Sequence, residues 1–168
     1  MKLAYTISDA PGQMNATLRG LADRLSAEGL RAVGAVQVNT DAAPDEPAAM
    51  DLVLLPDGPT VGISQRLGAG SSGCRLDPDA LERAVQQTAE RLAAGADVLI
   101  VNKFGAHEVD GRGFRELIGT ALESGTPAIV GVTTAKLPAF RDFVGDLAVA
   151  VPCDADTLHD WLFAPNEI

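Results

Sequence analysis

A short segment between two expected elements combines residue types and spacing that could bind phosphate. Residues 9–17, Asp-Ala-Pro-Gly-Gln-Met-Asn-Ala-Thr, connect an apolar strand at 3–8 to an amphipathic helix at 18–28. Such a turn can direct backbone N–H groups at a phosphate, while a lysine and a hydroxyl at its end neutralise the phosphate and hold Mg²⁺. Asn15 and Ala16 occupy those two positions here. Gly12, Asn15 and Thr17 are therefore predicted ligand-binding residues in a turn that lacks its phosphate-binding charge.

The second candidate segment, residues 102–113, follows a nearly all-apolar run at 96–102. Such a run is typical of a parallel strand covered by helices on both faces, and we expect it to be central. In an ATP-hydrolysing enzyme this strand leads into acidic residues that hold Mg²⁺ and orient the attacking water. Asn102 and Lys103 stand there instead. Lys103 would repel Mg²⁺ but could neutralise an anion, so Mg²⁺ is not expected here, and the sequence identifies no other cofactor.

His107 and Glu108 follow the glycine turn of this second segment. They could form a general acid–base pair or contribute to a metal site. No other histidine or cysteine lies at metal-ligand spacing from His107, which favours a hydrogen-bonding surface histidine over a metal ligand. Arg112 could bind an anion or lie on a solvated face. His107 and Glu108 are thus the candidates for catalysis, Arg112 is a candidate for ligand binding, and no metal-ligating residue is predicted.

A third candidate loop, at 67–76, combines glycines, hydroxyls, a thiol and an arginine. Its glycines would let the backbone approach a ligand closely, and the planar guanidinium of Arg75 suits an oxyanion. A turn that only joins the preceding hairpin to the next helix, with Cys74 packed as a small apolar residue, explains the same composition equally well. The predicted ligand-binding residues of this loop are Gly70, Ser71, Ser72, Gly73, Cys74 and Arg75.

These segments need a scaffold that brings them together, and the sequence predicts a mostly parallel sheet. Strands and helices alternate along the chain, which is typical of an α/β fold with helices on both faces. A β-hairpin is predicted at 51–65 around Asp57-Gly58, followed by a helix to Ala94 with Asp77 as N-cap. Ligands of such sheets bind beyond the carboxyl ends of the strands. The remaining expected strands are 31–38, 127–132 and 147–151, and the remaining helices are 114–124, 135–143 and 156–163.

Length and composition restrict the class of protein further. With 168 residues, 46% of them hydrophobic, the chain is large enough for one domain, residues 1–168, with a substantial core. A net charge of −10 argues against nucleic acid and anionic membranes as partners. No apolar run approaches the roughly 20 residues that span a bilayer, and no signal peptide is recognisable. We therefore expect no membrane insertion and a cytoplasmic location.

Taken together, these residues resemble a small family of P-loop nucleoside triphosphatases across nearly the whole chain. The resemblance rests on the order strand, Pro-Gly turn, helix, hairpin, a loop ending Arg75-Leu76-Asp77, and the segment 97–108. The chain looks closer still to a bacterial offshoot labelled ATPase-like and associated with molybdenum transport or metabolism. That resemblance implies a three-layer P-loop fold: a mostly parallel sheet, helices on both faces and a β-hairpin insertion.

Position by position, the resemblance also implies that hydrolytic residues have been lost. Asn15 replaces the lysine of the phosphate loop (the Walker A motif), and Ala16 replaces its Mg²⁺-binding hydroxyl. Asn102 and Lys103 replace the two acidic residues of the second motif (Walker B). Both motifs are thus degenerate, and together these changes remove nearly every electrostatic element on which phosphoryl transfer depends.

The sequence therefore favours a non-hydrolysing binding or regulatory protein that holds a small anionic ligand. A molybdate-like oxyanion and a nucleotide phosphate are both candidate ligands, and the resemblance adds a protein partner in molybdenum transport or metabolism. Two alternatives stay open. One is an active nucleoside triphosphatase that uses Lys103, His107, Glu108 and Arg75 in an altered site. The other is a pseudo-enzyme that docks onto another protein and binds no small molecule.

Overall fold

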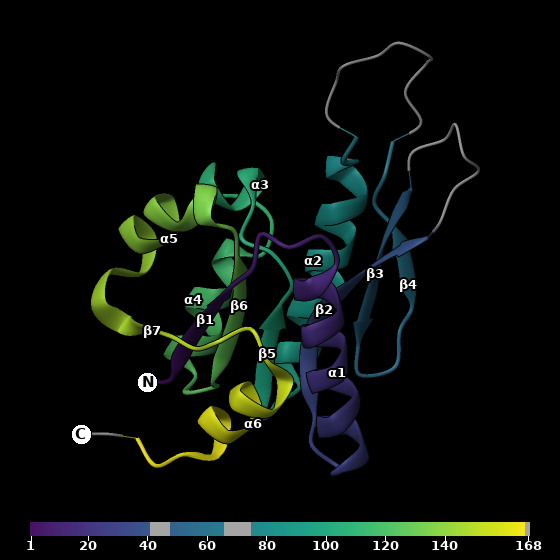
Figure 1. Ribbon diagram of the computed structural model, residues 1–168. Coiled ribbons are helices and arrows are strands. Elements are labelled where there is room, and N and C mark those ends of the chain that lie inside the picture. The colour runs from purple at the N-terminus through teal and green to yellow at the C-terminus, as the bar shows by residue number, and fades with distance from the viewer. Residues whose placement is uncertain (41–47, 66–74, 167–168) are drawn as a thin grey trace.

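The computed structural model describes residues 1–40, 48–65 and 75–166, which form a seven-stranded sheet flanked by helices (Figure 1). The strand order is β4-β3-β2-β5-β6-β1-β7. β1, β2, β5, β6 and β7 are parallel, whereas β3 is antiparallel to both β2 and β4. The predicted α/β class, mostly parallel with a hairpin at one edge, is confirmed. The strands are β1 (Leu3–Ile7), β2 (Ala32–Thr40), β3 (Ala49–Leu55), β4 (Thr60–Gly62), β5 (Val98–Val101), β6 (Ala128–Val132) and β7 (Ala148–Ala150).

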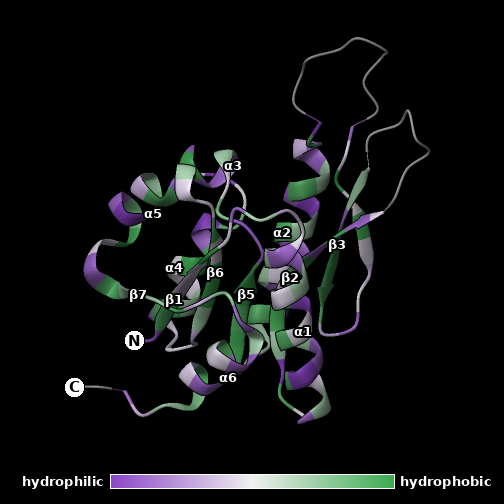
Figure 2. Ribbon diagram, viewed as in Figure 1, coloured by the Kyte–Doolittle hydropathy of each residue, from purple (hydrophilic) through white to green (hydrophobic). Residues whose placement is uncertain are grey.

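Helices cover both faces of the sheet, and its central strands are largely hydrophobic (Figure 2). One face packs against α2, α4 and α5, with Leu81, Ile118 and Phe140 in its core. The other packs against α1 and α6, with Leu21 and Leu158 in its core. The helices are α1 (Gln13–Ala27), α2 (Pro78–Ala93), α3 (Ala106–Val109), α4 (Arg115–Glu123), α5 (Leu137–Val144) and α6 (Ala155–Phe163), with 3-10 turns η1 (Thr134–Lys136) and η2 (Gly145–Leu147).

The apolar run at 96–102 contains β5 (Val98–Val101), which is the middle strand of the sheet, as predicted. All four residues of β5 are buried, because its neighbours β2 and β6 pair with it on both sides and helices cover both faces. β5 ends at Val101, so Asn102 and Lys103 emerge from the centre of the carboxyl edge of the sheet. This position explains why the loop that follows β5 reaches the cavities described below.

Helix α1 begins at Gln13, earlier than the start predicted at Leu18. Gly12 is its N-cap, with a left-handed φ of 75°, and no side chain caps the helix. Glycine adopts this φ without strain. Because the N-cap is a glycine, the sequence lacks the Ser, Thr, Asp or Asn that usually marks the start of a helix. The correction places Asn15 and Thr17 in the first turns of α1 rather than in a loop.

The connection from the hairpin to α2 agrees with the sequence at the helix and differs at the strand. The side chain of Asp77 accepts hydrogen bonds from the backbone N–H groups of Asp79 and Ala80, so the predicted N-cap is confirmed. β4 is shorter than predicted and ends at Gly62. Beyond it, Ile63 is buried in the core and Ser64 pairs with Leu76 only as an isolated bridge. Among residues 1–40, 48–65 and 75–166, no helix combines the length and apolar character required to cross a bilayer.

Candidate functional site

Two adjoining cavities lie at the carboxyl edge of the sheet, in the part of the chain that the structure describes. The larger, of about 330 Å³, lies between the hairpin, the start of α2 and the loop after β5. The smaller, of about 170 Å³, lies between the start of α1 and the ends of β1 and β6. Gln37, Asn102 and Lys103 line both. Residues of the first two predicted segments thus line cavities at this edge of the sheet.

Asn102 links three elements at the junction of the two cavities. Its side chain is 5% exposed. Its Oδ1 accepts a hydrogen bond from the backbone N–H of Gln37 at 2.9 Å, and its Nδ2 donates to Oδ1 of Asn15 at 2.9 Å. A buried amide needs such partners, because an unpaired polar group would lose its hydration without compensation. Asn102 thus connects Gln37 of β2 and the end of β5 to the first turn of α1.

The start of α1 presents Met14 and Asn15, rather than a charge, to the smaller cavity. Met14 also packs against Gly131 of β6, where an added Cβ would lie 2.8 Å from the Met14 sulfur. Of the other residues predicted in this region, Gly12 is exposed at the N-cap and Thr17 is half-buried. Neither lines the two cavities.

The turn before α1 is tied to the loop after β6. The carboxylate of Asp9 accepts hydrogen bonds from the backbone N–H of Thr134, at 3.0 Å, and from the Thr134 hydroxyl. The side-chain bond and then the backbone bond lower the pKa of Asp9, because both stabilise the charged carboxylate. These contacts lie next in sequence to Ser8 and Thr133, which line the smaller cavity.

The carboxylate of Glu108, in α3, is bonded to the backbone of the surrounding loop. Glu108 is 4% exposed. Its Oε2 accepts from the backbone N–H of Gly105 at 2.9 Å, and its Oε1 accepts from the N–H of Phe114 at 3.1 Å. Both carboxylate oxygens are therefore engaged in holding the loop after β5 to the start of α4. Glu108 lines the larger cavity from this fixed position.

Of the other polar residues predicted for the site, some line the larger cavity and one lies away from it. His107 is half-buried and lines the larger cavity. Arg75 lines it as well, and its Nη1 donates to the backbone oxygen of Ala48 at 3.0 Å. Arg112 is exposed and lines neither cavity. Its Nη2 lies 3.8 Å from Oδ2 of Asp110. The remaining predicted residues, Gly70, Ser71, Ser72, Gly73 and Cys74, lie outside the described part of the chain.

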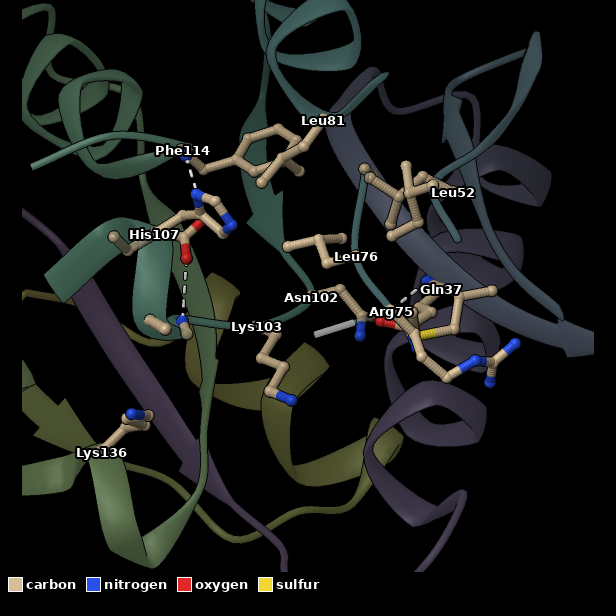
Figure 3. Close-up of a pocket in the computed structure, with 16 residues that line it drawn as sticks. Gln37, Leu52, Arg75, Leu76, Leu81, Asn102, Lys103, His107, Phe114 and Lys136 are labelled. Atoms are coloured by element: carbon tan, nitrogen blue, oxygen red, sulfur yellow. Dashed lines mark hydrogen bonds between the residues drawn. The ribbon is translucent and has the colours of Figure 1, made fainter. Parts of the chain in front are cut away.

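Two of the three lysines of the chain line the larger cavity, and Figure 3 shows them on one side of it. Lys103 follows β5 and is exposed, and Lys136 closes η1 and is half-buried. Leu52, Leu76 and Leu81 lie on the opposite side, in the same view. The third lysine, Lys2, is used elsewhere, because its Nζ donates to the backbone oxygens of Leu162 and Ala164 at 2.7 Å.

Polar and sulfur-containing side chains that line the cavities but were not predicted from the sequence are Gln37, Lys136, Met14, Ser8 and Thr133. The first two could have been found by applying the carboxyl-edge rule to every parallel strand, since Gln37 follows the buried part of β2 and Lys136 follows β6. Met14 could not, because its position depends on the early start of α1. Among the described residues, no group of three His, Cys, Asp or Glu side chains could hold a metal ion.

The strand order and the helices on both faces give the chain a P-loop nucleoside triphosphatase-like fold, which two solved structures share. THEP1 from the hyperthermophile Aquifex aeolicus superposes with a TM-score of 0.63 at 14% identity, covering 96% of this chain and 95% of that one. A human cancer-related nucleoside triphosphatase superposes with a TM-score of 0.59 at 15% identity, covering 90% and 89%. At these identities the similarity establishes the fold.

A family model described as "Protein of unknown function (DUF2478)" matches residues 3–161, and the chain belongs to this family. Among curated proteins, the "Molybdenum import ATP-binding protein ModC 2" of Bradyrhizobium diazoefficiens is 28% identical over 148 residues. The match covers 88% of this chain and 16% of that relative, so the chain corresponds to a small part of its length.

Proposed function

We propose that the protein is a non-hydrolysing binding domain that holds a small anionic ligand at the carboxyl edge of a P-loop scaffold. The observation that carries the proposal is the hydrogen-bonded chain from Gln37 through Asn102 to Asn15. In the family resemblance, Asn102 and Asn15 stand at the Walker B aspartate and the phosphate-loop lysine. An aspartate and a lysine would hold Mg²⁺ and phosphate, whereas these two amides bond to each other.

The side chains around the smaller cavity argue against a Mg²⁺ site in it. Its lining contains no aspartate or glutamate among the described residues. Mg²⁺ in phosphate-transferring sites is usually held by one or two carboxylates together with substrate oxygens, and Lys103 would oppose the ion. Lys103 is instead placed to offer a positive charge to an anion from the boundary of both cavities.

The identity of the anion is proposed from the relatives. The printed name of the Bradyrhizobium relative refers to molybdenum import and ATP binding. We propose a molybdate-like oxyanion or a nucleotide phosphate as the ligand, and a role for this cytoplasmic domain beside a protein partner in molybdenum transport or metabolism. The smaller cavity, of about 170 Å³, offers hydroxyl, amide and ammonium donors to such an oxyanion.

Thermal unfolding of the purified protein tests the proposal. Molybdate, tungstate, inorganic phosphate and nucleotides without Mg²⁺ are each added at millimolar concentration. A ligand present at a hundred times its Kd stabilises the folded state by about 2.7 kcal/mol, which raises Tm by roughly 5 to 10 °C for a domain of this size. At least one of these anions is expected to raise Tm, and an unchanged Tm with all of them would contradict the proposal.

An active nucleoside triphosphatase is the second candidate, because one of the two superposed structures carries that name. It would need a base, and Glu108 already uses both carboxylate oxygens as acceptors for backbone N–H groups. Release of phosphate from common nucleoside triphosphates with Mg²⁺ is measured beside a no-enzyme background. Our proposal expects no release above background, whereas Mg²⁺-dependent release that follows the protein through purification would favour the enzyme.

A further inference from the structure

The larger cavity has properties that a small inorganic anion does not explain. Its volume of about 330 Å³ is nearly twice that of the smaller cavity, at about 170 Å³. A water molecule occupies about 30 Å³ in the liquid, so a tetrahedral oxyanion would leave most of the larger cavity empty. Volumes above about 300 Å³ are typical of sites for organic ligands. If the proposed function holds, its ligand therefore has room for a body beyond the anionic group.

The walls of the larger cavity are largely apolar. Leu52 and Leu81 are buried in the core, and Leu76 is half-buried beside them. Phe114, 4% exposed, adds an aromatic ring. These side chains come from β3, from the segment before α2, from α2 and from the start of α4, so separate elements meet around one apolar space. Burying apolar ligand surface there would be favourable, at about 25 cal/mol per Å².

The charged side chains that line the larger cavity are mostly positive, although the chain as a whole is acidic. The net charge of the whole chain is −10, yet Arg75, Lys103 and Lys136 line this one cavity. Its only lining carboxylate among the described residues is Glu108, which is held by two backbone N–H groups. Figure 3 shows Lys103 and Lys136 on the side of the cavity opposite Leu81 and Phe114. A ligand with an anionic end and an apolar end would match this division.

We propose that the ligand is an organic anion: a compact, ring-sized apolar body in the larger cavity, joined to a phosphate-like or carboxylate group bound by Lys103. This inference rests on the proposed function and specifies its ligand class. Lys103 lines both cavities, so the anionic group can lie at their boundary while the body fills the apolar side. Gln37 and Asn102 form the shared wall between the two.

Three matched probes test the ligand class by calorimetric titration: 1-naphthyl phosphate, inorganic phosphate and 1-naphthol. The first combines an apolar body with the anion, and the others carry one part each. We expect 1-naphthyl phosphate to bind at least tenfold more tightly than either part. Tenfold corresponds to about 1.4 kcal/mol, which burial of roughly 60 Å² of apolar surface supplies.

Two variants locate the binding. Ala106 is exposed at the start of α3 and lines the larger cavity, so Ala106→Trp narrows that cavity with little cost to the fold. It should weaken 1-naphthyl phosphate at least tenfold and leave inorganic phosphate unchanged. Lys103→Ala should weaken both phosphates about tenfold or more. Unfolding midpoints of both variants without ligand confirm that they are folded.

The outcomes separate this inference from the proposed function. If inorganic anions bind but 1-naphthyl phosphate gains nothing over phosphate, the organic ligand class is wrong and the anion-binding function stands. Binding of 1-naphthol as tight as that of 1-naphthyl phosphate would overturn the role of the anionic group. If neither 1-naphthyl phosphate nor any inorganic anion binds, the anion-binding function and this inference fail together.

Discussion

At the scale of single residues, Asn102, which follows β5, joins Gln37 of β2 to Asn15 of α1 by two hydrogen bonds of 2.9 Å. Asn102 is buried and bonds to both Gln37 and Asn15, whereas Asn15 is half-buried and bonds to Asn102. Asn102→Ala leaves the Gln37 N–H and the Asn15 amide without a partner, so we expect it to lower the free energy of unfolding by about 1 to 3 kcal/mol.

Asn15→Ala should cost less than Asn102→Ala, because the amide of Asn102 keeps its bond to Gln37. The double variant should cost less than the sum of the two, since the shared bond is lost only once. Urea unfolding of the three variants and the wild type measures this cycle. Strict additivity would show that the two amides do not interact.

Gly113 is a second residue whose identity is fixed by a neighbour. Its φ is 62°, and an added Cβ would lie 2.2 Å from Oε1 of Glu108. Gly113→Ala should therefore lower the free energy of unfolding by more than about 1 kcal/mol, through both backbone strain and displacement of Glu108. Gly119→Ala is the matched control, because Gly119 lies inside α4 with nothing within 4 Å of an added Cβ. That control should be neutral or stabilising by up to about 1 kcal/mol, and equal destabilisation by both would refute the steric argument.

At the scale of elements, α2 is positioned by Asp77, whose side chain caps the helix and whose N–H donates to the Ile63 oxygen of the hairpin at 2.7 Å. We expect Asp77→Ala to lower the free energy of unfolding by about 1 kcal/mol, because the N–H groups of Asp79 and Ala80 lose their acceptor. Asp77→Asn keeps an acceptor and should cost little. Denaturant unfolding compares the two, and a similar loss in both would show that the cap contributes through its charge alone.

The elements also show how far the sequence could predict the fold. β5 and the α2 cap were predictable because each depends on a local pattern, an apolar run or an Asp-Pro start. The start of α1 was not, because a glycine in the left-handed conformation replaces the usual capping side chain. The bond between Asn15 and Asn102 was also out of reach, since it joins positions far apart in sequence whose distance depends on that helix start.

At the scale of the whole molecule, three acidic residues make stability depend on pH, two of them through bonds between distant elements and one through a helix cap. Asp9 bonds to Thr134, Glu28 to His159 of α6, and Asp154 caps α6 through Thr157. Hydrogen bonds from these partners lower the pKa of each carboxyl below its ordinary value of 3.8 or 4.5. A carboxyl with a lowered folded-state pKa contributes stability above its ordinary pKa and loses it as the pH falls through the lowered one.

We therefore expect the unfolding midpoint in urea to fall as the pH decreases below about 4.5, with the unfolded state taking up more protons than the folded state. Asp9→Asn should make this dependence shallower, because it removes one of the groups that titrate. Asp142→Asn is the control, since Asp142 is exposed and has no hydrogen-bond or ion-pair partner among the described residues. The three carboxyls are exposed, so each effect will be small. A midpoint that is flat between pH 6 and 3 would contradict this prediction.

The candidate site was predictable in its location and less so in its composition. The carboxyl-edge rule placed Asn102, Lys103 and Asn15 correctly beside one another, because parallel strands end at one edge of the sheet. The apolar walls of the larger cavity were not apparent, since residues such as Leu81 and Phe114 have the pattern of ordinary core residues. Only the packing of β3, α2 and α4 shows that they surround a space.

The central claim is that Lys103 supplies the charge that binds an anion at this edge. Calorimetric titration of molybdate, tungstate and inorganic phosphate into the wild type, Lys103→Ala and Arg83→Ala tests it most directly. Arg83 is exposed on α2 and lines neither cavity, so it controls for the loss of one positive charge. We predict that Lys103→Ala weakens the best-bound anion about tenfold or more while Arg83→Ala leaves its Kd unchanged. Equal Kd values in the wild type and Lys103→Ala would contradict the claim.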